Sequence, residues 1–323
     1  MNNRRKFQKK RLSGGYLGVL LVVFITVTLI VACRADKKNN TLKTLTISFI
    51  PDYDMAAKAN RLGPVAAYLK NMLKLEKVII FRCTDDASVI EAMKAKKVDI
   101  AYFGQFSYVL AHERAGAEAL VMAGTSTESQ LGNSLIIVNS KSRIFNIGDI
   151  KKKASRLIIG FSDPSSTTGH IIPRAYLASV GLDPEKNFKQ MYFASSHGAC
   201  ILAIKTGKVD VGCVNNNTLK KLLVNGIIKT QDIRIIWKSP GIYTSPIAVR
   251  SDLPVKLKDR IRQAYLDLPK ESPVVWRDFV EKEYLYYDEK IRKNLIYLPS
   301  NDTLYNNIRK IANSLDVKLL LNQ

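Results

Sequence analysis

The chain contains the same helix, turn and strand pattern twice. Residues 87–100 (ASVIEAMKAKKVDI) align without a gap on residues 198–211 (GACILAIKTGKVDV), an offset of 111 positions from Ala87 to Gly198. Each copy is typical of an amphipathic helix, a short basic turn and a buried strand. This repeat predicts two α/β lobes that each hold one copy at the same place. A chance likeness between two short α/β segments is the alternative.

The segments around the repeat alternate between strand-like and helical patterns, which predicts mostly parallel sheets flanked by helices. In the first half we expect strands at 45–50, 78–82 and 98–103, with helices at 54–74, 85–96 and 105–116. In the second half we expect strands at 157–161, 189–193, 209–214 and 233–238.

Two crossings between the lobes predict a hinge. The strand expected at 134–139 leads toward the second lobe, and the Pro- and Gly-containing segment 239–249 returns from it. We therefore expect residues 43–138 and 246–323 to form lobe 1. Residues 139–245 would form lobe 2, and helices would fill the chain from Pro254 onward.

Hydroxyl side chains crowd one expected strand-to-helix turn. The sequence from Asp163 to His170 reads DPSSTTGH, between an apolar strand and a helical pattern over 171–179. A helix start has unpaired backbone N–H groups and a partial positive charge, and nearby hydroxyls add further donors. The turn therefore predicts a site for a small oxyanion that involves Ser165, Ser166, Thr167 and Thr168. A simple helix cap is the alternative, since a single Ser or Thr suffices for that role.

The repeat extends this prediction to both lobes. In open α/β sheets, ligands bind beyond the carboxyl ends of the strands, where helices begin. Asp86 and His197 are also 111 positions apart and begin the two repeated helices, so we expect them to face each other across a cleft. Gln105 ends a strand at the same edge, and Tyr53 follows the first strand, where it would close over a ligand or serve in packing. Asp99 and Asp210 lie inside the repeat, and we assign them structural roles.

The N-terminal segment predicts export and membrane attachment. Six basic residues between Arg4 and Arg11 precede an uncharged apolar run from Tyr16 to Ala32, followed by Cys33. The tetrad Ile30-Val31-Ala32-Cys33 resembles a bacterial lipobox, which implies a signal peptide over 1–33, a lipidated Cys33 and a tether over 34–42. An uncleaved membrane anchor is the alternative, because about 17 apolar residues approach the length of a bilayer span. The body would then work outside the cytoplasmic membrane.

Composition argues against several classes of function. The formal net charge is +22, but the lysines alternate with acids and form no arginine-rich tract, so we expect no nucleic-acid partner. The three histidines lie far apart in the sequence, and neither a metal site nor a cofactor is expected. The remaining cysteines, Cys83, Cys200 and Cys213, are predicted to be small core residues.

Several segments together resemble one family, the substrate-binding proteins of ABC importers for phosphonate, phosphite and phosphate, often called PhnD-like. The matching segments are residues 98–108, 163–173, 195–197, 207–210 and 237–240, within a resemblance that covers about residues 45–250. The family implies a type II periplasmic-binding-protein fold with two lobes and a hinge. It also implies a monomer that captures a phosphorus oxyanion and delivers it to a membrane permease driven by a separate ATPase.

The resemblance implies roles for particular residues. Ser166, Thr167 and Thr168 would hold the phosphoryl oxygens, and His197 would complete the cradle. Relatives that bind 2-aminoethylphosphonate have tyrosines at the positions of Asp86 and Gly132, and carboxylates at those of Asn217 and Ser245. An aminoalkyl phosphonate is therefore disfavoured, since its ammonium group would be buried without charged partners. Asp86 would accept a hydrogen bond from a P–OH group or act as a plain helix cap, so inorganic phosphate, phosphite and a small phosphonate all remain candidates.

Two other functions remain open. Ser166, His197 and an aspartate could form a hydrolase triad, although no Gly-x-Ser-x-Gly elbow supports an enzyme. The basic surface could instead make the protein an adhesion or scaffold lipoprotein for acidic polymers.

Overall fold

The computed structural model describes residues 42–51, 54–127 and 132–315. The predicted signal peptide, Cys33 and most of the tether lie outside these residues, as does Tyr53. The described chain from Lys43 onward forms one compact unit. Within the described ranges, no helix combines the length and apolar character needed to cross a membrane.

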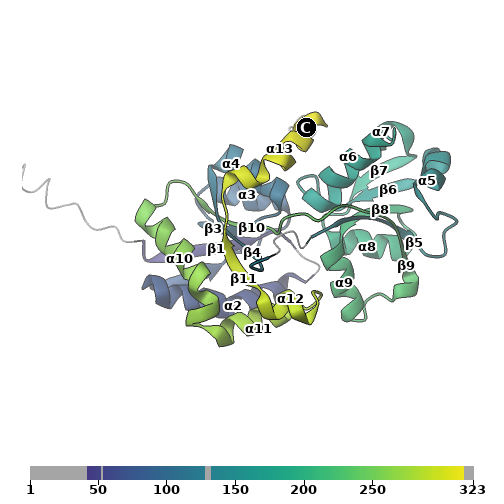
Figure 1. Ribbon diagram of the computed structural model, residues 1–323. Helices are drawn as coiled ribbons and strands as arrows, with labels where there is room; N and C mark the ends of the chain where they lie inside the picture. The colour runs from purple at the N-terminus through teal and green to yellow at the C-terminus, as the bar shows by residue number, and fades with distance from the viewer. Residues whose placement is uncertain (1–41, 52–53, 128–131, 316–323) are drawn as a thin grey trace, which may run out of the picture. The chain divides into compact units, whose positions relative to one another are not determined.

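The first lobe is built on a six-stranded sheet with the order β11-β4-β10-β3-β1-β2 (Figure 1). Strand β1 pairs in parallel with β2 and β3, whereas β10 is antiparallel to β3 and β4, and β11 is antiparallel to β4. The strands are β1 (Thr44–Phe49), β2 (Lys77–Ile80), β3 (Ile100–Tyr102), β4 (Ala117–Gly124), β10 (Pro246–Arg250) and β11 (Ile296–Pro299).

The second lobe is built on a five-stranded sheet with the order β7-β6-β8-β5-β9. Strands β6, β7 and β8 are parallel, and β5 runs antiparallel to β8 and β9. The strands are β5 (Ser134–Asn139), β6 (Ile158–Phe161), β7 (Gln190–Phe193), β8 (Val211–Asn215) and β9 (Ile233–Lys238).

The predicted α/β fold with two lobes is confirmed, but the sheets are mixed rather than mostly parallel. The strand that enters each sheet after a crossing, β5 or β10, runs against its neighbours. By sheet membership, the chain leaves the first sheet after β4 and returns at β10. This places the first crossing before Ser134, earlier than the expected boundary at residue 138.

Helices cover both faces of each sheet (Figure 1). In the first lobe, α2, α10 and α11 pack together, and α4 packs against α3 and α13. The helices of this lobe are α2 (Met55–Leu73), α3 (Asp86–Lys94), α4 (Gln105–Ala115), α10 (Val255–Glu271), α11 (Pro273–Glu283), α12 (Glu289–Asn294) and α13 (Asn306–Ser314). Those of the second lobe are α5 (Ile147–Lys153), α6 (Ile172–Ser179), α7 (Pro184–Asn187), α8 (His197–Lys205) and α9 (Asn216–Val224).

Alternate residues of β5 enter two different cores, because successive side chains of a strand point to opposite faces of its sheet. Ile136 and Val138 join the cluster under α5 and α6, whereas Leu135 and Ile137 join the cluster under α8 and α9. Cys83, Cys200 and Cys213 are buried and form no disulfide. The residues from Lys43 onward therefore contain both sheets and complete cores of their own.

The sequence repeat is a structural repeat, with α3 and β3 in one lobe and α8 and β8 in the other. Asp99 Oδ2 accepts a 2.7 Å hydrogen bond from the Thr46 N–H, and Asp210 Oδ2 accepts one of 2.8 Å from the Ile158 N–H. Both aspartates thus tie the repeat to a neighbouring strand, β1 or β6. The turns correspond as well, since Lys96 and Gly207 both have left-handed backbone conformations, with φ of 59° and 74°.

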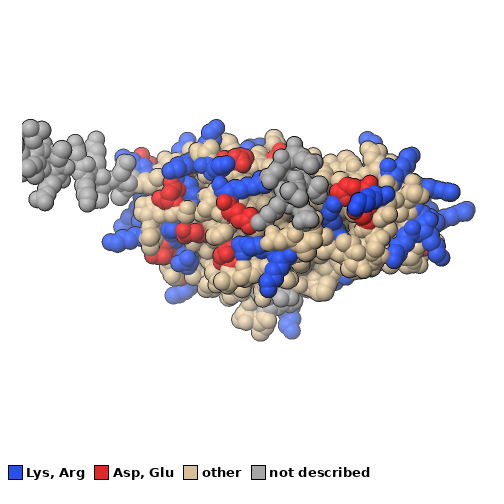
Figure 2. Space-filling view, turned by 90° about the horizontal axis from the view of Figure 1, so that it is seen from above, with Lys and Arg blue, Asp and Glu red and all other residues tan. Residues whose placement is uncertain are grey.

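Charged side chains cover much of the visible surface in Figure 2, where lysines and arginines gather at the end of the second lobe. On the first lobe, basic and acidic groups are interspersed in the same view. This distribution agrees with solvated helix faces over most of the molecule.

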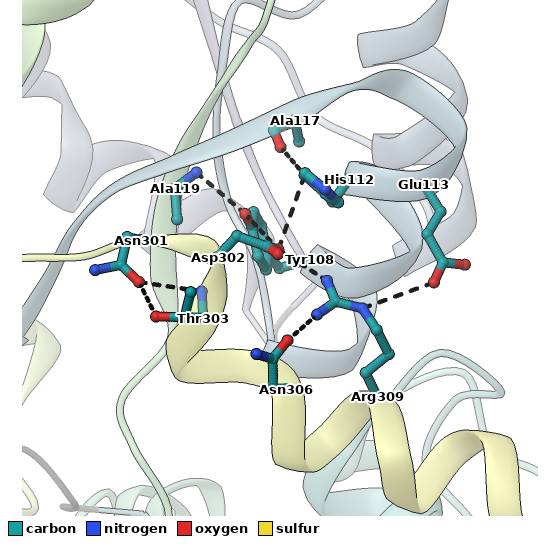
Figure 3. Close-up of polar contacts among 10 residues, drawn as sticks. All are labelled: Tyr108, His112, Glu113, Ala117, Ala119, Asn301, Asp302, Thr303, Asn306 and Arg309. Carbon is teal, nitrogen blue, oxygen red and sulfur yellow. Dashed lines mark hydrogen bonds and ion pairs between the residues drawn. The ribbon is translucent and has the colours of Figure 1, made fainter.

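Helix α13 holds α4 in place through a polar network (Figure 3). Asp302 Oδ1 accepts hydrogen bonds from Tyr108 Oη at 3.2 Å and from Arg309 Nη2 at 2.8 Å. The His112 ring contacts the carbonyl of Ala117 at 2.8 Å. The network therefore ties the middle and the C-terminal turn of α4 to the segment from Asp302 to Arg309.

Candidate ligand-binding site

A cleft of about 210 Å³ lies between the two lobes. Its walls include Gly104 and Gln105 after β3, Ser162 and Asp163 after β6, and the segment 195–197 after β7. These are carboxyl ends of strands, as expected for a ligand site in an α/β protein.

Five helical segments begin at this cleft. The first helical residues of α3, α4, α8 and α9 all line it, and so does the first residue of a π-helical turn over Thr167–Ile171. Each helix start carries a partial positive charge, and those first N–H groups that no cap satisfies are available to an anion. The cleft therefore attracts an anion through backbone dipoles, without a cluster of lysines or arginines. The lining positions are Asp86 in α3, Gln105 in α4, Thr167 in the π-helical turn, His197 in α8 and Asn216 in α9.

The hydroxyl-rich turn is organised around Ser166. Ser166 Oγ accepts a 3.1 Å hydrogen bond from the Gly169 N–H, which makes Ser166 the cap of the turn. The backbone N–H groups of Thr167 and Thr168 have no partner among the residues that the structure describes. These two N–H groups, at the cleft, are available to the oxygens of a ligand.

His197 is held in one tautomer by its neighbours. The Asn215 N–H donates a 3.2 Å hydrogen bond to Nδ1, so in the neutral ring the proton is on Nε2. Nε2 lies 3.4 Å from Ser166 Oγ, beside the capping turn. Ser195, two residues earlier, adopts a left-handed φ of 69° that helps direct this segment into the cleft. His197 is thereby set up as a hydrogen-bond donor.

Polar contacts also join the turn to its surroundings. Thr167 Oγ1 accepts a 2.7 Å hydrogen bond from the Phe106 N–H, which belongs to the first turn of α4 in the other lobe. The carbonyl oxygen of Thr168 accepts a 2.6 Å hydrogen bond from Ser134 Oγ at the start of β5. The turn is therefore fixed from both lobes, while the hydroxyl proton of Thr167 remains available for donation.

Two buried carboxyl groups from opposite lobes lie close together at the cleft. Burial raises the pKa of Asp86 well above its ordinary range, and the neighbouring Asp163 carboxylate raises it further, while the Lys58 ammonium lowers it. Burial also raises the pKa of Asp163, although its hydrogen bonds with Ser165 and with the Asp86 N–H lower it. Asp86 therefore has a raised affinity for a proton, which makes it able to share one with an oxyanion.

The other predicted site residues, Gln105 and Ser165, differ in whether they reach the cleft. Gln105 lines the cleft, and its Nε2 donates to the carbonyl of Tyr243 in the return crossing. Ser165 is buried beneath the turn and does not line the cleft, since its N–H donates to Asp163 Oδ1 at 2.7 Å. Asp86, Ser166, Thr167, Thr168 and His197 are all brought together in the lining. No group of three metal-ligating side chains occurs among the described residues.

Sequence reasoning missed several lining residues. Lys58 of α2 reaches the cleft with its Nζ 3.1 Å from the carbonyl of Ile50, and no motif around it marks this role. Asn215 orients His197 through its backbone, which sequence cannot show. Gly169 packs so closely that a Cβ there would lie 1.8 Å from Ser162 Oγ and 2.7 Å from His197 Cε1. In the sequence, the only sign of this role is that Gly169 directly follows the run of hydroxyl residues that ends at Thr168.

The cleft offers little to an ammonium group. Besides Asp86 and Asp163, the carboxylate in its lining is Glu283, which forms a 2.7 Å ion pair with Arg61 and lies 3.8 Å from Lys221 Nζ. Asn217 is a neutral amide, and its Nδ2 lies 3.4 Å from Tyr287 Oη. Outside the Asp86–Asp163 pair, a buried ammonium would therefore meet no carboxylate that is not already paired.

Comparison with known proteins agrees with this geometry. Residues 47–283 match the family described as "ABC transporter, phosphonate, periplasmic substrate-binding protein". The phosphonates-binding periplasmic protein of Escherichia coli is 33% identical over 204 residues, covering 62% of this chain and 60% of that protein. The phosphate-import protein PhnD of Mycolicibacterium smegmatis is 26% identical over 247 residues, covering 72% of this chain and 76% of that protein.

Comparison with a solved structure indicates the same family. A binding protein component of an ABC phosphonate transporter from Pseudomonas aeruginosa superposes with a TM-score of 0.73 and 26% identity, covering 83% of this chain and 85% of that one. On the match to more than half of its length, this chain belongs to the family of periplasmic substrate-binding proteins of ABC phosphonate transporters.

Proposed function

We propose that this protein is the extracytoplasmic solute-binding component of an ABC importer that captures a small phosphorus oxyanion between its lobes. The ligand would be phosphate, phosphite or a small phosphonate. A membrane permease with its own ATPase would receive it. The names of the relatives, which include phosphonate-binding and phosphate-import proteins, support this ligand class.

One observation carries the proposal, namely the unpartnered N–H groups of Thr167 and Thr168 at a cleft where five helical segments begin. A phosphoryl group has several oxygens that accept hydrogen bonds, and a helix start is suited to bind it. The hydroxyls of Ser166, Thr167 and Thr168 and the Nε2–H group of His197 would surround the remaining oxygens. We therefore assign these four residues to ligand binding.

Asp86 would select for ligands that share a proton. A buried carboxyl group with a raised pKa can donate its proton to a phosphoryl oxygen, or accept one from a P–OH group when ionised. Sulfate has no proton to donate at neutral pH, so Asp86 can donate a hydrogen bond to it but cannot accept one from it. We expect sulfate to bind more weakly than the phosphorus oxyanions.

A hydrolase is disfavoured by the state of His197. A general base in a serine hydrolase needs a free lone pair on the nitrogen that faces the serine, and a carboxylate on the other nitrogen. Here the Asn215 N–H donates to Nδ1, so the neutral ring carries its proton on Nε2, toward Ser166. His197 can donate to an anion but cannot deprotonate Ser166 from this tautomer.

The sequence and the family support a proposal for the location of the protein. We propose that Cys33 is lipidated and that cleavage before it removes residues 1–32, so that the body is a monomer tethered outside the cytoplasmic membrane. Mass spectrometry of the membrane-extracted protein would test this point. A diacylglyceryl group on an N-terminal Cys33 is expected, whereas an intact N-terminus at Met1 would contradict lipidation.

A thermal-shift panel tests the ligand class. The protein without residues 1–33 would be unfolded, washed free of ligand and refolded before it meets phosphate, phosphite, methylphosphonate, 2-aminoethylphosphonate or sulfate. A ligand at about 100 times its Kd adds roughly 2.7 kcal/mol to the free energy of unfolding. We expect a shift from at least one of the first three and little from the other two. A flat panel would contradict the proposed ligand class, and turnover of a phosphate ester lost in Ser166→Ala would favour an enzyme.

A further inference from the structure

A phenylalanine stands exposed in a basic region at the far end of the second lobe, away from the cleft. The side chain of Phe145, in the loop between β5 and α5, is 63% exposed. Lysines and arginines gather around this end of the lobe (Figure 2). A single exposed apolar residue is common, so it is the basic side chains around this ring that make the region a candidate contact surface.

The charges of this region are concentrated in a short stretch. Residues 141–156 contain six basic residues and a single acid, Asp149. The carboxylate of Asp149 is engaged locally, since it accepts a 2.8 Å hydrogen bond from the Phe145 N–H. Five of the basic side chains are exposed, and none of the five has an ion-pair partner among the described residues. We call these five residues and Phe145 the basic patch: Lys141, Arg143, Phe145, Lys151, Lys152 and Arg156.

The loop that carries Phe145 is held in one conformation by hydrogen bonds from two basic side chains. Arg234 of β9 donates hydrogen bonds to the carbonyl oxygens of Ser140 at 2.6 Å, Ser142 at 3.1 Å and Ile144 at 2.9 Å. The same guanidinium lies 4.4 Å from the centre of the Phe145 ring. Lys153 Nζ also donates to the carbonyl oxygen of Arg143 at 2.5 Å. The ring is therefore presented to solvent by an ordered frame.

We propose that the basic patch docks on an anionic lipid bilayer. Lysine and arginine side chains at a membrane surface are attracted to anionic headgroups. An aromatic ring among them can enter the interfacial layer beneath the phosphates. The patch offers both parts, and its single aromatic lacks the series of stacking rings typical of single-stranded nucleic-acid binders.

The predicted anchor makes such a contact useful. A tether over 34–42 spans at most about 30 Å when extended, so the body of a lipidated protein would remain close to the membrane. The tether enters at β1 in the first lobe, whereas the basic patch lies on the second lobe. A second attachment there would restrict the orientation of both lobes at the bilayer. The docking itself is independent of the ligand that the cleft binds.

Vesicle flotation tests this proposal. The protein without residues 1–33, which retains both sheets and their cores, is mixed with vesicles of phosphatidylcholine alone or with added phosphatidylglycerol. We expect binding only to the anionic vesicles, with loss of binding as salt rises. No binding to the anionic vesicles at low salt would overturn the proposal.

Matched variants separate the basic patch from net charge. Lys151→Glu with Lys152→Glu should weaken vesicle binding by at least roughly thirtyfold, since each basic residue near an anionic surface adds about a factor of five. Lys256→Glu with Lys290→Glu changes the net charge equally at exposed positions on the first lobe and should retain most binding. Equal losses in the two double variants would contradict docking through the basic patch.

The aromatic ring distinguishes a bilayer from other polyanions. Phe145→Ser should weaken binding to anionic vesicles by roughly fivefold to tenfold, and Phe145→Trp should restore it. Binding to single-stranded DNA should be weak and insensitive to this residue. Equal binding to DNA and vesicles, unaffected by Phe145→Ser, would mean that the basic patch binds any polyanion through charge alone. That result would overturn the assignment to a bilayer. Circular dichroism of each variant confirms that the fold is retained.

Discussion

The Phe106 N–H of one lobe donates a 2.7 Å hydrogen bond to Thr167 Oγ1 of the other. Helix α4 has a glycine at its N-cap and no side-chain cap of its own, so Thr167 supplies that cap across the cleft. The second lobe thus caps a helix of the first at the place where an oxyanion would bind.

Removing the Thr167 hydroxyl should weaken ligand binding. Thr167→Val leaves the Phe106 N–H unpaired in the closed protein, at a cost of about 1–3 kcal/mol, which corresponds to a roughly 5-fold to 150-fold higher Kd. Isothermal titration with the ligand found in the thermal-shift panel measures this change. Thr167→Ser keeps the hydroxyl and should bind nearly as the wild type. An unchanged Kd in the valine variant would show that the contact does not support the bound state.

Gly169 should tolerate no side chain. A Cβ at this position would lie 2.7 Å from His197 Cε1 and would collide with Ser162, so Gly169→Ala must displace the histidine or the turn. We expect at least a tenfold loss of affinity, about 1.4 kcal/mol, in titrations with the same ligand. Gly63→Ala in α2 serves as the control, because Gly63 does not line the cleft and no atom outside its chain neighbours lies within 4 Å of its Cβ, so the Kd should stay at the wild-type value. Wild-type affinity in Gly169→Ala would contradict the geometry of the cradle.

Asp86 should make stability depend on pH. Its pKa in the folded protein is raised above 3.8, so the folded state holds the proton more tightly than the unfolded state. Stability from this group is fully present below its unfolded pKa and is lost as pH rises through the folded pKa. Asn carries no charge, so Asp86→Asn should raise the Tm of the ligand-free protein more at pH 8 than at pH 5. Equal Tm differences at the two pH values would contradict the raised pKa.

Asp210 should matter for stability and not for the ligand. Asp210→Ala leaves the Ile158 N–H at the start of β6 without its 2.8 Å partner. We expect the free energy of unfolding in urea to fall by about 1–3 kcal/mol, with an unchanged Kd for the ligand in titrations of the folded variant. A large change in Kd at unchanged stability would instead place Asp210 in the binding machinery.

The sequence predicted the elements that carry a clear periodic pattern. The strands expected at 134–139 and 233–238 agree with β5 and β9, and the repeat located α3 and α8 correctly. Strand β4 was missed, because its sequence AEALVMAG is rich in residues of low strand propensity and follows α4 after only Gly116. Strand β11 was also missed in a region expected to be helical. It is four residues long and ends in Pro299, so it gives little periodic signal.

Part of the site was visible in the sequence, because the hydroxyls of Ser166, Thr167 and Thr168 are consecutive and His197 follows from the repeat. The long-range partners were not. The Phe106 N–H, the Asn215 N–H and the Lys58 ammonium come from segments distant in sequence, and two of them act through backbone atoms that carry no residue signature. Ser165 was wrongly grouped with the lining, because sequence alone does not show which hydroxyls of a turn face inward.

A crystal structure of the complex with the tightest-binding phosphorus oxyanion tests the central claim most directly. We predict phosphoryl oxygens within about 2.7–3.2 Å of the backbone nitrogens of Thr167 and Thr168, with His197 Nε2 donating to the same group. A ligand bound elsewhere, or hydroxyls of the turn directed away from a ligand in the cleft, would contradict the account.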